Sequence, residues 1–268
     1  MKNTKRHNSV LERTIGGSLE FRISSAVISK GYGSKENGMG DNKQNKIGKW
    51  KKIANWFLFI TLILSIPYII VKVILAPAEV TTEYTKVKSD YVLMLVQCLL
   101  GLVVMMVPKI IERKRSIDIP DVMEILYVVF LYCAIFLGEV RDFYYLVPHW
   151  DTVLHAFSAA MLGVIGFTLV DLLNETEQAR LRLSPFFVAL FAFCFALTVG
   201  CLWEIYEYTF DGILSLNMQK YKLADGTQLV GREALSDTMK DIIVDALSAL
   251  VISIIGYQSI RKREKKRN

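Results

Sequence analysis

Acidic and histidine side chains recur at helical spacing near the ends of three apolar segments of this 268-residue chain. The three sets are Asp151 with His155, Glu204 with Glu207 and Asp211, and Asp237 with Asp241 and Asp245. Because side chains three or four residues apart share one face of a helix, each set predicts a polar stripe. An acid costs about 2.5–3.5 kcal/mol at the centre of a membrane helix, so this clustering favours a polar site over chance.

A structural explanation without a ligand exists for most of these residues. Asp151 at the start of its helix is a typical N-cap, and acids in a first helical turn are stabilised by the helix dipole. Three acids on one stripe can also be held by an arginine, for which Arg141 and Arg232 are the candidates. Asp245 lies further along among aliphatic residues, so it is expected to be paired, protonated or bound to a metal.

The mixture of imidazole and carboxylate groups favours a metal-assisted hydrolase or transferase. A lone histidine in an apolar helix is usually a hydrogen-bonded core residue, but a carboxylate one turn away favours a ligand role for His155. A divalent cofactor, Zn²⁺, Mn²⁺ or Mg²⁺, is therefore expected. The candidate ligands are Asp151, His155, Glu204, Asp211, Asp241 and Asp245.

The same interpretation assigns catalytic roles to residues beside the ligands. Glu207 is the candidate general base, and Arg141 or Arg232 is the candidate clamp for a phosphate or carboxylate group. The expected substrate is lipid-linked or part of the cell envelope. The chain has no His-Glu-x-x-His, Gly-x-Ser-x-Gly or phosphate-loop motif, so standard zinc-protease, serine-hydrolase and nucleotide-driven mechanisms have no support.

Two other functions stay open. A chain of titratable groups formed by His155, Glu204, Glu207 and Asp245 also suits a proton- or cation-coupled transporter. Acids confined to one side argue against a complete pathway, and the segments show no clear internal repeat that would indicate alternating access. The third interpretation is a non-catalytic envelope or assembly factor whose buried ion pairs hold its helices together.

Composition indicates that the elements positioning these residues are membrane helices. The chain is 53% hydrophobic with a mean hydropathy of +0.34, and this apolar excess must face lipid. Its net charge of +6 arises from Lys and Arg that flank the apolar runs, so anionic headgroups are expected as partners and nucleic acid is not. The four cysteines all lie in apolar runs and indicate no disulfide framework.

The predicted fold class is all-α, a polytopic membrane helical bundle of about six transmembrane helices within residues 53–260. Each expected span has roughly the length that crosses a bilayer, and the six are residues 56–76, 91–111, 122–138, 153–173, 185–203 and 242–260. Residues 1–52 are expected to form a disordered basic cytoplasmic tail, and residues 261–268 a second basic cytoplasmic tail. Asp225-Gly226 predicts a short extracytoplasmic hairpin flap between the last two spans.

Basic residues predict the orientation of the chain in a bacterial cytoplasmic membrane. They concentrate before the first span, after the second and fourth, and at the end of the chain. By the positive-inside rule both termini are cytoplasmic. The three acidic sets are then expected to meet at the outer face. The oligomeric state has no sequence signature.

Several of these motifs occur together in one known family. They are Gly138-Glu139-Val140-Arg141-Asp142, Trp150-Asp151-x-x-Leu154-His155, Trp203-Glu204-x-Tyr206-Glu207-Tyr208, and Asp237-Thr238-Met239-x-Asp241 with Asp245. The chain resembles the YjdF-like family of uncharacterised bacterial membrane proteins over residues 56–260. It is more distantly similar to VanZ-like proteins, with Glu207, Asp245 and Ser248 where that pattern has an amide, an amide and a glycine. The second resemblance implies action at the cell envelope.

Overall fold

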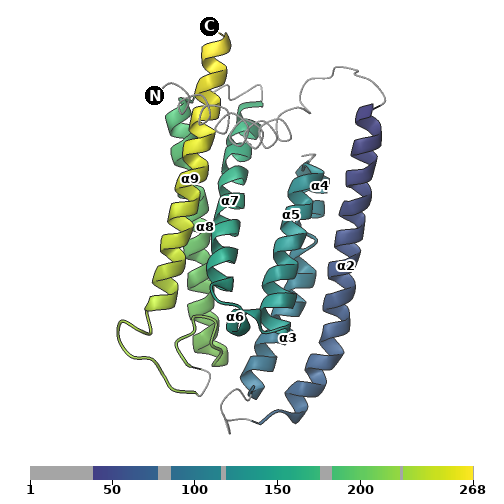
Figure 1. The fold of residues 1–268 in the computed structure, drawn as a ribbon, viewed down its shortest axis with the longest axis vertical. Helices are drawn as coiled ribbons and strands as arrows, with labels where there is room; N and C mark the ends of the chain where they lie inside the picture. Colours follow the sequence, from purple (N-terminus) through teal and green to yellow (C-terminus); the bar gives the residue numbers. More distant parts are fainter. Residues whose placement is uncertain (1–38, 78–85, 116–118, 176–182, 224–225, 268) are drawn as a thin grey trace, which may run out of the picture.

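The computed structural model describes residues 39–77, 86–115, 119–175, 183–223 and 226–267. Figure 1 shows long helices that run side by side from one end of the molecule to the other. In chain order the elements are α2 (Met39–Leu75), α3 (Lys88–Val104), α4 (Val107–Arg115), α5 (Asp121–Leu131), the π-helix η2 (Tyr132–Val140), α6 (Phe143–Leu146), α7 (Trp150–Glu175), α8 (Pro185–Leu214) and α9 (Ser236–Arg267). The predicted all-α class is confirmed.

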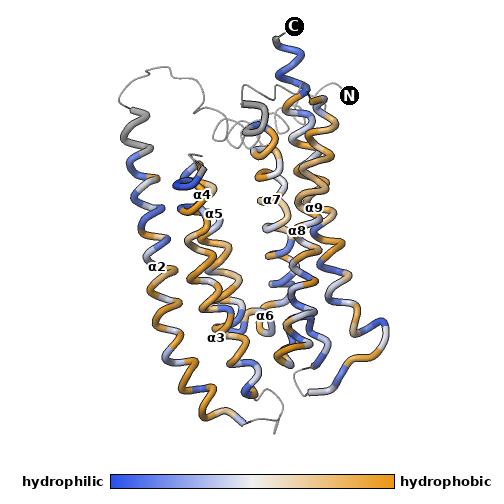
Figure 2. Tube along the Cα trace, turned by 180° about the vertical axis from the view of Figure 1, so that it is seen from behind, coloured by the Kyte–Doolittle hydropathy of each residue, from blue (hydrophilic) through white to orange (hydrophobic). Residues whose placement is uncertain are grey.

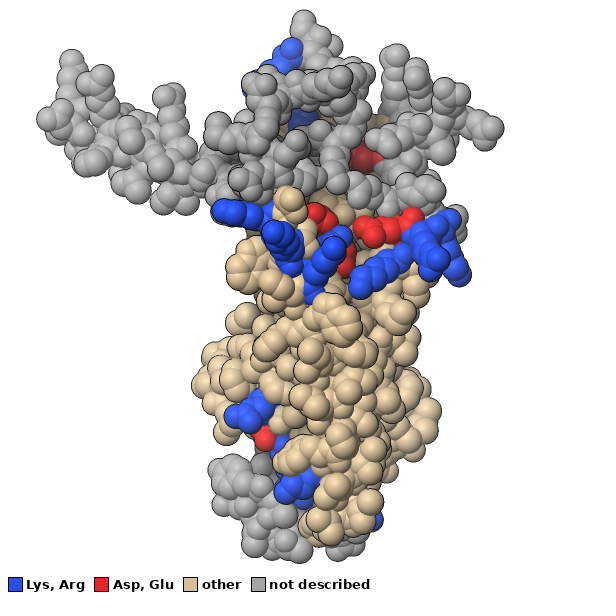
Figure 3. Space-filling view, turned by 90° about the vertical axis from the view of Figure 1, so that its right-hand side faces the viewer, with Lys and Arg blue, Asp and Glu red and all other residues tan. Residues whose placement is uncertain are grey.

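Within the described ranges, five segments are long and apolar enough to cross a membrane, and they are Asn45–Leu75, Lys88–Lys114, Asp121–Val140, Trp150–Asp171 and Pro185–Leu214. Hydrophobic residues dominate the middle of the bundle in Figure 2, and Figure 3 shows a broad uncharged surface between charged groups near the two ends. A membrane helical bundle therefore fits the chain. The sixth expected span, residues 242–260, lies within α9 and stays a prediction, because α9 is not among these five.

The helices pack as two groups joined through η2. In one group α7, α8 and α9 all contact one another, and in the other α2 contacts α3 and α5. Small residues bring the first group close together, since a Cβ atom on Gly166 would lie 2.8 Å from Ala192 Cα, and one on Gly163 would lie 3.0 Å from Ile252 Cγ2. The three-helix group α7–α8–α9 is thus a tightly packed support for the residues it carries.

The second expected span is interrupted, because Pro108 follows the end of α3. A proline lacks the backbone N–H that would bond the carbonyl four residues earlier, which here is Val104. The chain makes a turn at residues 105–106 before α4 begins. The Tyr127 hydroxyl of α5 donates a hydrogen bond of 2.8 Å to the Val104 carbonyl, so the oxygen that the proline releases is satisfied inside the bundle.

Several helix ends lie outside the predicted boundaries. α2 begins at Met39, so residues 39–52 are helical where a disordered tail was expected, and residues 1–38 lie outside the described part of the chain. α9 likewise continues to Arg267 through most of the expected basic tail. Lys and Arg are good helix formers whose long side chains reach polar surroundings, so a basic composition does not end a helix.

The predicted hairpin between α8 and α9 is present as a single pair of bridged residues. Lys222 pairs with Gln228, and the Leu223 N–H donates to the Thr227 carbonyl at 2.9 Å. Gly226 has a φ of 85°, which a glycine adopts without strain. This hairpin lies at the opposite end of the bundle from the start of α2 and the end of α9 (Figure 1). Which compartment each end faces remains a prediction.

Candidate functional site

Four buried polar residues from α7, α8 and α9 converge near the hairpin end of the bundle. His155 of α7, Glu204 of α8 and Asp241 and Asp245 of α9 are 8%, 4%, 4% and 2% exposed. α8 extends to Leu214 and α9 begins at Ser236, so every predicted acid of the last two sets is helical. The close packing of these three helices brings together residues up to 90 positions apart in the chain.

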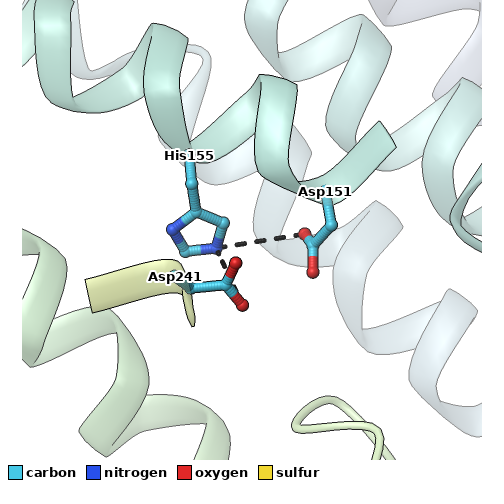
Figure 4. A group of neighbouring side chains, drawn as sticks. All are labelled: Asp151, His155 and Asp241. Atoms are coloured by element: carbon cyan, nitrogen blue, oxygen red, sulfur yellow. Dashed lines mark ion pairs between the residues drawn. The ribbon is translucent and has the colours of Figure 1, made fainter. Parts of the chain in front are cut away.

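One ring nitrogen of His155 faces three carboxylates. His155 Nε2 lies 3.9 Å from Asp151 Oδ1, 3.9 Å from Glu204 Oε1 and 4.0 Å from Asp241 Oδ2. The convergence of Asp151, His155 and Asp241 can be followed in Figure 4. These separations exceed a hydrogen bond, so His155 Nε2 does not bond directly to any of the three carboxylates.

The spacing of the cluster suits a small cation. One ligand atom each from Asp151, His155 and Asp241 lie within 4.8 Å of one another. At the centre of an equilateral triangle with edges of 4.8 Å, an ion would be about 2.8 Å from each atom, longer than Zn²⁺ bonds of about 2.0–2.2 Å. The side chains would move inward by about 0.5–1 Å to bind such an ion. The donor set of one imidazole and several carboxylates matches divalent metals of intermediate softness.

The other ring nitrogen of His155 is held by Asp245. His155 Nδ1 lies 3.3 Å from Asp245 Oδ1 and 3.4 Å from Asp245 Oδ2. A carboxylate in this position favours the tautomer with a proton on Nδ1 and leaves the Nε2 lone pair free for a ligand. Asp245 was predicted as a metal ligand, but the structure places it behind the imidazole, where it orients His155. Gly200 of α8 makes this possible, since a Cβ atom there would collide with the Asp245 carboxylate.

Glu204 is the member of the cluster that the protein leaves unsatisfied. Both of its carboxylate oxygens are buried, and neither accepts a hydrogen bond of ordinary geometry within the described ranges, although the Thr238 side chain of α9 interacts with this carboxylate. A buried polar group without a partner costs about 1–3 kcal/mol, and more when it is charged. Among the described side chains, the His155 imidazole faces it at 3.9 Å. Glu204 therefore has the coordination capacity that a bound cation would use.

Lys220 is the polar residue of this region that the sequence interpretation missed. Its ammonium group forms ion pairs with Asp151 and, at 3.3 Å, with Asp237 Oδ2. Burial alone would lower the pKa of Lys220, but the carboxylates of Asp151 and Asp237 outweigh burial and raise this pKa above its ordinary value. Loop lysines are usually solvated. The length of the polar stretch between α8 and α9 was the only sequence feature to indicate that a basic residue folds back toward the cluster.

Three predicted site residues lie elsewhere. Asp211 accepts hydrogen bonds from the backbone N–H groups of Met218 at 2.8 Å and Gln219 at 3.0 Å, so it shapes the loop after α8. Its assignment as a metal ligand stays a prediction, and in this structure each oxygen accepts one backbone hydrogen bond. Arg141 and Arg232 are exposed. The cation that pairs with an acid of the cluster is instead Lys220.

Glu207, the predicted general base, lines a cavity that adjoins the cluster. The cavity has a volume of about 270 Å³ and is also lined by Asp151, His155, Lys220 and Asp245. Glu207 Oε1 accepts a hydrogen bond of 2.9 Å from Trp203 Nε1 one turn earlier in α8. The Glu207 carboxylate is thereby held at the wall of a cavity that His155 also lines.

Comparison with known proteins places the chain among membrane proteins. Residues 56–262 match the profile of a family described as predicted membrane protein (DUF2238). An uncharacterised protein of Thermotoga maritima is 26% identical over 152 residues, which cover 56% of this chain and 70% of that protein. No solved structure matches the chain. The matched range contains every residue of the cluster and of the cavity.

Proposed function

Because this chain belongs to the DUF2238 family of predicted membrane proteins, whose description states no activity, we propose a function from the site itself. The protein is a divalent-metal-dependent hydrolase or transferase that acts on a lipid-linked or cell-envelope substrate at the membrane. The observation that carries this proposal is Glu204, a buried carboxylate that faces the His155 imidazole and whose oxygens accept no hydrogen bond of ordinary geometry among the described residues. Glu124 also has one such oxygen, but Lys51 pairs with it, whereas no lysine or arginine of the described residues pairs with Glu204.

Each residue of the cluster has a role in this proposal. Asp151, His155, Glu204 and Asp241 hold the metal, and Asp245 orients the imidazole from behind. The metal would supply a Lewis acid that lowers the pKa of bound water and polarises the substrate. Glu207, at the wall of the adjoining cavity, would serve as the general base. Lys220 takes the place expected of Arg141 or Arg232 as the cation beside the cluster, where it pairs with Asp151.

The motif resemblance supports an envelope substrate. The residues shared with YjdF-like and VanZ-like proteins are those that the fold gathers at the cluster, including Asp151, His155 and Glu204. A VanZ-like kinship would connect the site to cell-envelope chemistry. The substitution of acids for amides at Glu207 and Asp245 increases the negative charge of this chain, which favours cation binding.

Cation-coupled transport is the second candidate, and one observation favours it. A second buried polar group, Glu124, lies in the first turn of α5 and is 2% exposed. Lys51 of α2 pairs with it at 3.0 Å, and Asn55 donates to it at 3.0 Å. Because Glu124 is already satisfied by α2, it supports a transport pathway less strongly than Glu204 supports a metal site.

Metal analysis of the detergent-purified protein tests the first proposal. We expect about one Zn²⁺ or Mn²⁺ per chain after loading and removal of excess ion, and none in a His155→Ala, Asp241→Asn double variant. A His149→Asn variant is the matched control, since His149 is exposed and its positive φ of 59° suits asparagine. A wild-type protein that retains no divalent ion, or a double variant that retains it, would overturn the proposal.

A further inference from the structure

The cavity beside the cluster is larger than a metal ion needs, and most of its wall is hydrocarbon. It lies between α3, α5 and η2 on one side and α7 and α8 on the other, with the loop after α8 contributing Asn217, Met218 and Lys220. Its apolar wall includes Leu100 and Leu162. Ligand pockets in proteins are mostly apolar with a few convergent polar groups, and this cavity has that composition.

The charges of the cavity wall are not balanced. Its carboxylates are Glu139, Asp151, Glu207 and Asp245, against the single lysine Lys220 and His155. Lys220 pairs with Asp151 and Asp237, and His155 pairs with Asp245. Among the described residues no lysine, arginine or histidine lies within ion-pair distance of Glu139 or Glu207, and Lys220 acts on both carboxylates only from further away. Two carboxylates, one from η2 and one from α8, therefore share the cavity wall without a cation in direct contact.

Aromatic rings line the same wall. Tyr127, Phe130, Tyr144, Tyr145 and Trp203 all contribute to it. The faces of such rings attract cations, and one example is already present, because Lys220 Nζ lies 5.4 Å from the centroid of the Tyr144 ring. A cavity that combines unpaired carboxylates, aromatic faces and hydrocarbon is complementary to a positively charged group attached to an apolar body.

We propose that this cavity binds an organic cation with an apolar body, whose ammonium group lies between Glu139 and Glu207. The apolar part contacts the side chains of α3, α5 and α7, and the aromatic rings surround the charge. An anionic ligand would instead meet four carboxylates of the cavity wall against Lys220 and His155, which are already paired with acids. This inference goes beyond the proposed metal chemistry, because neither Glu204 nor Asp241 lines the cavity.

Titration calorimetry on the protein in lipid nanodiscs tests this proposal with two probes of similar size and opposite charge. Benzyltrimethylammonium is the cation and phenylmethanesulfonate is the anion. We expect the cation to bind at least tenfold more tightly than the anion. We also expect Glu139→Gln to weaken cation binding at least tenfold, whereas Glu233→Gln, which removes an exposed loop acid, changes it less than twofold.

Two outcomes would overturn the proposal. One is equal binding of the two probes, or no binding of the cation, and the other is an unchanged cation affinity in Glu139→Gln that still folds by circular dichroism. The Asp241→Asn variant separates this test from that of the metal site. It should lose metal and keep cation binding, so a failure of either proposal is visible while the other stands.

Discussion

Replacement of Asp245 by asparagine tests whether the imidazole is held ready for a metal. Both Asp245 oxygens lie near His155 Nδ1, at 3.3 and 3.4 Å, so the charge and the orientation of the imidazole depend on this carboxylate. Asparagine keeps the size and one acceptor oxygen but removes the charge. Loss of such a partner behind a ligating histidine weakens metal binding about 10- to 100-fold, which is about 1.4–2.8 kcal/mol.

The assay is a competition titration with a chromogenic Zn²⁺ chelator at pH 7 on protein in nanodiscs. Asp245→Asn should lower the Zn²⁺ affinity by the stated factor. Asp241→Asn removes a direct ligand and should lower it by more than 100-fold. The two aspartates lie one turn apart on α9 and are both buried, so the pair controls for the general effect of neutralising an acid there.

Two results would refute this reasoning. If Asp245→Asn binds Zn²⁺ as tightly as the wild type, Asp245 does not tune the imidazole. If it loses as much affinity as Asp241→Asn, Asp245 is itself a ligand and the geometry described above does not represent the metal-bound protein. A fall in the melting temperature of the metal-free variant would reveal a folding defect, and the comparison is valid only without one.

Three further predictions concern the neighbours of the imidazole. Gly200→Ala should weaken Zn²⁺ binding at least tenfold, because its Cβ would displace the Asp245 carboxylate, whereas Gly212→Ala on the same helix meets nothing within 4 Å and should leave binding unchanged. Glu204→Gln should raise the melting temperature of the metal-free protein, because it removes a buried charge without a partner, and should abolish stabilisation by Zn²⁺. Lys220→Met should strengthen Zn²⁺ binding, because it removes the cation that competes for a ligand carboxylate, and should destabilise the metal-free protein.

The same titration and thermal-shift measurements decide all three. Equal affinities in the two glycine variants would show that the space beside Asp245 does not matter. A lower melting temperature of metal-free Glu204→Gln would mean that this carboxylate is a structural partner. Weaker Zn²⁺ binding in Lys220→Met would mean that Lys220 supports the site and does not compete with the metal.

Sequence spacing predicted the helices of the site well, since an acid at every third or fourth position keeps one face of a helix whatever its neighbours are. It also brought Asp151, His155, Glu204 and Asp241 into one set, because membrane helices that end on the same side place their ends together. The separate roles of these four residues could not be predicted from the sequence. Which nitrogen of His155 meets which acid depends on the rotation of α9 and on the space at Gly200, and neither has a sequence period.

The positions of the basic loop residues could not be predicted from the sequence. Arg141 and Arg232 were expected to balance the acids, and both are exposed, whereas Lys220 folds back. The fold-back depends on Asp211, whose oxygens bind the backbone of Met218 and Gln219 just before the lysine. A contact between a helix and the backbone of a loop leaves no residue pattern, so the basic residues of the loop looked equivalent.

The two buried acidic groups of this bundle differ in a way that bears on function. Glu124 lies beside a lysine at 3.0 Å and accepts an amide hydrogen bond from Asn55, as expected of a charge that stabilises helix packing. Glu204 is almost equally buried, and among the described residues it has neither a lysine partner nor an amide donor, although Lys220 pairs with Asp151 and Asp237. The proposed metal site predicts this difference, because a carboxylate that faces a histidine and pairs with no lysine keeps its oxygens available for a cation.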